Sequence, residues 1–136
     1  MVVAAYSWAV GSSGAYIVNS SKCQIVLAEN QSEGLSRLTF PYVINPGSAE
    51  RFDIQFPTGH FSSHYLNLIY DVLCDDSPDA GILRVIMFEN EPTTAGVCVY
   101  NNELAMDPGW SPREGVSCGV LQDEAGGAYT LRVRPQ

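Results

Sequence analysis

The sequence predicts an all-β fold, a single antiparallel β-sandwich of roughly eight or more strands. Three observations support this prediction. Apolar and polar residues alternate with a period of two in several short runs, no longer stretch keeps a helical period, and turn residues separate the runs. The chain of 136 residues has ordinary domain length and shows no boundary, repeat or low-complexity segment, so we expect one domain over residues 1–136.

Three short runs are predicted as strands because their side chains follow a period of two. Residues 23–27 place Cys23, Ile25 and Leu27 on one face, and residues 51–56 alternate strictly between polar and apolar side chains. The last alternating run, residues 129–134, closes the chain. Its expected core-facing side chains are Tyr129, Leu131 and Val133.

Three further strands come from the middle of the chain. Residues 66–73 carry apolar side chains on both faces, and one face is continuous: Leu66, Leu68, Tyr70 and Val72. Residues 82–88 are apolar on both faces except at Arg84, which is typical of a central strand covered on both sides. Residues 97–100 are a shorter candidate.

Turn residues lie between these runs. Asn45-Pro46-Gly47-Ser48 combines a proline, which fixes φ, with a glycine that is free to adopt a positive φ. The acidic stretch 75–79 separates two strong strands, and Gly126-Gly127 precedes the last one. Proline and glycine recur in residues 101–115, which are therefore predicted to form a long loop.

The charge balance argues against a nucleic-acid partner. Seven basic residues against fifteen acidic ones give a formal net charge of −8, whereas phosphate binding needs clustered lysine and arginine. Lys22 is the single lysine, and the arginines are scattered along the sequence. Anionic lipid is disfavoured for the same reason, but a zwitterionic head group or a neutral sugar is not.

The cysteines leave two interpretations open. Their spacing does not indicate a zinc ribbon, and their even number allows two disulfides in any connectivity. Four buried free thiols are the favoured interpretation, because free cysteine is among the most buried residue types and no secretion signal is evident. The four residues are Cys23, Cys74, Cys98 and Cys118.

The first ten residues, MVVAAYSWAV, fit a signal peptide poorly and are too short to span a membrane. We therefore expect a protein that is cytoplasmic or that is secreted without a recognisable signal peptide. Two glycosylation sequons, Asn19-Ser20-Ser21 and Asn30-Gln31-Ser32, receive little weight because the motif is common by chance.

Three motifs follow one another through the middle of the chain. Residues 15–21, AYIVNSS, carry an aliphatic-x-Asn-x-Ser turn, and residues 42–48, YVINPGS, form a Pro-Gly corner. A hairpin is formed by residues 70–73, an acidic turn after them and residues 83–88. Pro92 follows this hairpin. In this order the motifs resemble the opening strands, the corner and the central hairpin of the actinoporin-like β-sandwich superfamily, which includes the aegerolysins.

This resemblance implies a non-enzymatic protein that binds membrane lipid, as cytolysins and hemolysins do. It would dock on zwitterionic or sphingolipid head groups through loop aromatics. Two alternatives stay open. One is a carbohydrate-binding lectin on the same fold, and the other is a protein-interaction or oligomeric sandwich with an exposed apolar patch.

No motif indicates an enzyme, a metal or a cofactor. His60 and His64 have an i, i+4 spacing, which brings metal ligands together only on a helix, and their segment is predicted to be a loop. Asp75, Asp76 and Asp79 suit a solvated turn and lack the spacing of an EF-hand. The nucleophile elbow of a serine hydrolase is absent.

The binding residues are expected among the aromatic side chains and their neighbours. Trp110 lies in the predicted loop, where an indole suits a membrane interface or a sugar ring, although it could instead fold back over the sandwich. Tyr100 and Tyr65 are further aromatic candidates, Pro92 shapes the adjacent loop, and Asn101 offers hydrogen bonds to a sugar.

Overall fold

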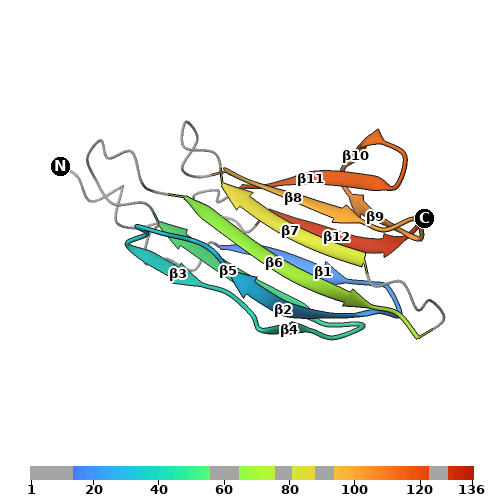
Figure 1. Ribbon diagram of the computed structural model, residues 1–136, viewed down its shortest axis with the longest axis horizontal. Coiled ribbons are helices and arrows are strands. Elements are labelled where there is room, and N and C mark those ends of the chain that lie inside the picture. Colours follow the sequence, from blue (N-terminus) through green and yellow to red (C-terminus); the bar gives the residue numbers. More distant parts are fainter. Residues whose placement is uncertain (1–13, 56–64, 76–80, 88–93, 123–128) are drawn as a thin grey trace.

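Figure 1 shows the computed structural model, which describes residues 14–55, 65–75, 81–87, 94–122 and 129–136. These residues form twelve strands in two sheets. One sheet has five strands in the spatial order β3 (Arg37–Thr39), β5 (Ala49–Gln55), β1 (Ala15–Asn19), β12 (Tyr129–Pro135) and β9 (Leu104–Asp107). The other has seven, in the order β10 (Trp110–Arg113), β11 (Val116–Gln122), β8 (Thr94–Tyr100), β7 (Gly81–Met87), β6 (Leu66–Leu73), β2 (Gln24–Asn30) and β4 (Val43–Ile44).

The all-β sandwich predicted from the sequence is confirmed. Neighbouring strands pair antiparallel, except that β1 and β12 run parallel. Phe52 of the five-stranded sheet meets Tyr70 of the seven-stranded sheet edge to face, with ring centroids 6.4 Å apart. This contact lies in the core between the two sheets.

Part of the core consists of the alternating side chains that the sequence marks as inward-facing. Every second residue of β6 is fully buried, as predicted, and so are Leu131 and Val133 of β12. Leu83, Val85, Val97 and Val99 extend the core across β7 and β8. Because alternate side chains point to opposite faces, the intervening residues of these strands form the outer face of their sheet.

Strand β7 is central, as predicted, but the expectation that both its faces are covered is wrong. It is the fourth strand of the seven, yet Ile82 on its outer face is 42% exposed. Arg84 and Ile86 on the same face are half-buried. The sheets pack on one side only, so a doubly apolar strand leaves apolar side chains on the outside.

The long loop expected over residues 101–115 is also wrong, because this stretch forms β9 and β10. Its proline and glycine are compatible with strands at this position. Strand β10 is at the edge of its sheet, where Pro112 removes no ladder hydrogen bond from the interior of the sheet. A Cβ at Gly109 would collide with the carbonyl oxygens of Cys118 and Met106, so the chain approaches closely here.

The favoured interpretation of four free thiols is wrong, because the cysteines form two disulfides. Cys98 and Cys118 are direct partners in the β8–β11 ladder, with Cα atoms 4.1 Å apart. Cys23 precedes β2 and Cys74 follows β6 at the end where Gln24 pairs with Leu73, and their Cα atoms are 4.3 Å apart. Strand pairing places both couples within bonding reach, which spacing along the sequence does not show.

The described residues contain no helix that is long and apolar enough to cross a membrane.

Candidate functional site

Apolar side chains gather at one end of the outer face of the seven-stranded sheet. Ile82, Tyr100 and Val116 are direct ladder partners across β7, β8 and β11, so they form a row on the same face. Leu73 lies diagonally beside Ile82, and it is 46% exposed. We call Leu73, Ile82, Tyr100, Val116 and Trp110 the outer patch, in which Leu73, Ile82 and Trp110 are exposed, Tyr100 is half-buried and Val116 is buried.

Trp110 extends the outer patch to the sheet edge. It pairs with Cys118, so its indole lies on the same face as the Cys98–Cys118 disulfide and is 55% exposed. Ser111 holds the edge strand in place, because its hydroxyl donates to the carbonyl oxygen of Val116 at 2.7 Å. The indole is therefore carried by an anchored strand, and it does not fold back over the sandwich.

The charges on this outer face balance. The charged side chains that its strands turn outward are two acids, Glu29 and Asp71, and two bases, Arg84 and Arg113. Arg84 Nε also donates to Asn67 Oδ1 at 3.0 Å, which holds its guanidinium on the sheet. The described strands of this sheet thus turn equal numbers of acidic and basic side chains outward, although the chain as a whole has a net charge of −8.

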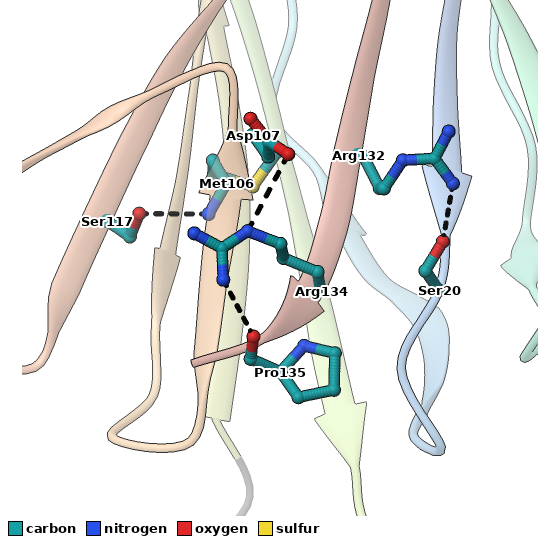
Figure 2. Close-up of polar contacts among 7 residues, drawn as sticks. All are labelled: Ser20, Met106, Asp107, Ser117, Arg132, Arg134 and Pro135. Atoms are coloured by element: carbon teal, nitrogen blue, oxygen red, sulfur yellow. Dashed lines mark hydrogen bonds and ion pairs between the residues drawn. The ribbon is translucent and has the colours of Figure 1, made fainter.

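The outer face of the five-stranded sheet has the opposite character. Figure 2 shows Arg132 and Arg134 of β12 with their partners, namely Ser20 Oγ at 2.7 Å and Asp107 at 3.7 Å. Arg51 and Asp53 form a further ion pair on β5, at 3.1 Å. Three of the arginines that are scattered along the sequence, Arg51, Arg132 and Arg134, therefore lie on this face, which is polar.

Tyr65 does not belong to the outer patch. It precedes β6 at the end of the strand opposite to Leu73, where it bridges to Glu33. Its hydroxyl donates to Glu33 Oε2 at 2.9 Å. The hydrogen bond to Glu33, and then the charge of that carboxylate, raise the pKa of Tyr65 above its usual value.

Asn101 follows Tyr100 at the rim of the outer patch, but its side chain has a structural task. Its Oδ1 accepts a hydrogen bond from the backbone N–H of Glu103 at 2.7 Å, which shapes the turn into β9. The structure therefore brings Trp110, Tyr100 and Asn101 to one region and leaves Tyr65 outside it. Pro92 lies outside the described residues, as do His60 and His64.

A cavity of about 320 Å³ opens beside the outer patch, at the end of the sandwich where Leu73 and Tyr100 lie. Its charged lining consists of the ammonium of Lys22 and the carboxylates of Asp75 and Glu103. Lys22 adjoins Cys23 and Asp75 adjoins Cys74, so the disulfide joins the two parts of the wall. Sequence reasoning missed this cavity because the strand pairing and the disulfide that bring its lining residues together do not show in the sequence.

Among the described residues no group of three or more histidine, cysteine, aspartate or glutamate side chains is placed to hold a metal ion. The arrangement offers an apolar face, an exposed indole and a small cavity with both signs of charge.

Comparisons of this chain with protein-family models, with curated proteins and with solved structures each give no match. The resemblance to actinoporin-like proteins therefore stays a prediction from the sequence.

Proposed function

We propose that this protein is a non-enzymatic lipid-binding module that docks on zwitterionic membrane surfaces through the outer patch. The observation that carries the proposal is the apolar, charge-balanced sheet face, with an exposed indole at its edge, in a chain whose net charge is −8. Tryptophan and tyrosine are enriched where membrane and water meet, because each has an apolar body and one polar group.

Charge decides between the kinds of surface. The negative potential of an anionic leaflet opposes the approach of an acidic protein, whereas a zwitterionic leaflet does not. A second copy of this chain is disfavoured as the occupant, because each copy would bring a net charge of −8 to the contact. A zwitterionic bilayer therefore fits the outer patch better than an anionic bilayer or a second copy of this chain does.

The cavity beside the outer patch complements the same partner. Lys22 offers an ammonium for a phosphate, and Asp75 and Glu103 offer carboxylates for the positive part of a head group. The three groups lie at the same end of the sandwich as Leu73 and Tyr100, so an apolar contact and head-group contacts would form at that end.

The test is co-sedimentation with vesicles of phosphatidylcholine and sphingomyelin, using two variants that each add one negative charge. Ile82→Asp places a carboxylate in the outer patch, and Thr130→Asp places one on the outer face of the other sheet, where Thr130 is exposed. We expect Ile82→Asp to weaken binding at least about tenfold, ~1.4 kcal/mol, and Thr130→Asp to bind as the wild type does.

Two results would overturn the proposal. One is that the wild-type protein binds none of the vesicles, and the other is that both variants lose vesicle binding equally. Binding that free sugars abolish whatever the lipid composition would favour the lectin alternative. A mass that rises with protein concentration, without vesicle binding, would favour the oligomeric one.

A further inference from the structure

The two glycosylation sequons of this chain have opposite environments. Asn19 is fully buried at the end of β1, whereas Asn30 is exposed at the end of β2. Each asparagine uses its side-chain oxygen to cap the backbone N–H two residues later, at 3.1 Å for Ser21 and at 2.9 Å for Ser32. The two sites therefore share a local turn geometry and differ in what surrounds the amide nitrogen.

Asn19 has no room for a glycan in this fold. Its Nδ2 donates two hydrogen bonds, to the carbonyl oxygens of Cys23 at 2.7 Å and of Ile44 at 3.0 Å. N-glycosylation replaces one hydrogen of this nitrogen with a sugar, so one of the two bonds would be lost. The sugar would also have to fit where the side chain has no exposed surface.

Asn30 can carry a glycan without loss of structure. A glycan on its Nδ2 leaves Oδ1 free to keep the bond from the N–H of Ser32. Asn30 pairs with Leu68, several ladder positions from the pair of Gln24 with Leu73. A glycan there would project from the end of the sandwich that is remote from the outer patch.

The two disulfides indicate that the protein, and with it both sequons, passes through an oxidising compartment. Two cross-links, Cys23–Cys74 and Cys98–Cys118, tie all four cysteines of the chain. Disulfides of this structural kind form and persist in the secretory route and outside the cell, and they are rare in the cytosol. In eukaryotes that route also contains the enzyme that glycosylates accessible sequons.

We propose that Asn30 is an N-glycosylation site of this protein and that Asn19 is not. The site takes an oligosaccharide from a lipid pyrophosphate donor: the amide nitrogen loses one proton to the transferase and forms an N–C bond to the sugar, as the C–O bond between the sugar and the pyrophosphate breaks and the pyrophosphate leaves. This inference does not depend on the proposed lipid binding, because it rests on burial, hydrogen bonds and disulfides alone.

The test is secretion of the full chain from a eukaryotic cell behind a cleavable signal, followed by mass spectrometry with and without peptide N-glycosidase. The glycosidase converts a glycosylated asparagine to aspartate, so peptide mapping reads Asn30 and Asn19 separately in the same wild-type protein. Asn30→Gln removes the acceptor, and Asn102→Gln is the matched control at an exposed asparagine outside any sequon.

We expect conversion to aspartate at Asn30, none at Asn19, and loss of the glycan in Asn30→Gln but not in Asn102→Gln. Secreted, folded wild-type protein without a glycan at Asn30 would overturn the proposal. A glycan at Asn19 in the folded protein would overturn it as well, since it would contradict the burial of that side chain.

Discussion

At the scale of single residues, Asn19 fixes the β1–β2 turn from inside. It donates to two backbone carbonyls and accepts from the N–H and the hydroxyl of Ser21, at 3.1 and 2.6 Å. A buried asparagine with every group satisfied costs little to desolvate and specifies one turn geometry. This explains in physical terms why an Asn-x-Ser motif opens the fold.

Asn19→Ala should lower the free energy of unfolding by about 2–4 kcal/mol, because it removes the amide donor to the carbonyls of Cys23 and Ile44 and the buried acceptor for Ser21. Gln24→Ala is the control, since it removes an exposed side-chain bond to Asn45 and should cost less than about 0.5 kcal/mol. Urea unfolding of both variants measures the difference. Equal losses would contradict the role given to Asn19.

Tyr70 makes stability depend on alkaline pH. Its ring is buried and its hydroxyl donates to the carbonyl oxygen of Pro41 at 2.8 Å; burial raises its pKa well above the usual 10.0. Below the pKa that Tyr70 has in the unfolded chain, the folded and unfolded states both hold the phenol proton, so the contribution of Tyr70 to stability is fully present there. As the pH rises above that value, Tyr70 ionises in the unfolded chain first, so stability falls until the pH reaches the higher pKa of Tyr70 in the folded protein.

Tyr70→Phe should therefore be less stable than the wild type near neutral pH, because Pro41 loses its donor, but should lose less further stability on alkalinisation. Urea midpoints from about pH 8 to pH 11 provide the measurement. An equally steep decline in the variant would show that Tyr70 is not the group responsible.

At the scale of elements, strands that are distant in sequence are tied by covalent bonds. One disulfide closes a separation of 51 residues and connects the ends of β2 and β6, and the other closes 20 residues across β8 and β11. Removing a cross-link enlarges the conformational freedom of the unfolded chain, more so for the longer loop.

The double variant Cys23→Ser/Cys74→Ser should lose about 4 kcal/mol of stability, and Cys98→Ser/Cys118→Ser about 3 kcal/mol. Unfolding of the two double variants in guanidinium measures the free energy of unfolding that each one has lost. If the shorter loop proved the costlier one, loop closure would not be the dominant effect.

The alternation of apolar and polar residues predicted which face of a strand is buried better than it predicted which strands pair with each other. It placed Leu68 and Val72 in the core, because a period of two separates inside from outside. It could not pair Cys98 with Cys118, and it missed β9 and β10 because proline and glycine at a sheet edge look the same in sequence as in a loop. For Trp110 the sequence left open whether the indole is exposed or folds back over the sandwich; it is exposed, and it lies on a strand rather than in the predicted loop.

At the scale of the whole molecule, the two outer faces differ in kind. The five-stranded sheet turns arginines and their ion pairs outward, and the seven-stranded sheet carries the outer patch together with two acidic and two basic side chains. This division follows from strand order, which brings Ile82, Tyr100 and Val116 from three segments of the chain into one row. Composition and net charge cannot show it, because they average over both faces.

The central claim is that the indole of Trp110 enters a zwitterionic membrane surface. It is tested most directly by quenching of tryptophan fluorescence with brominated phosphatidylcholine in vesicles. Trp8→Phe leaves Trp110 as the only indole of the chain, so the signal reports one position. We predict quenching and a blue shift when these vesicles are added; emission unchanged at saturating lipid would contradict the account.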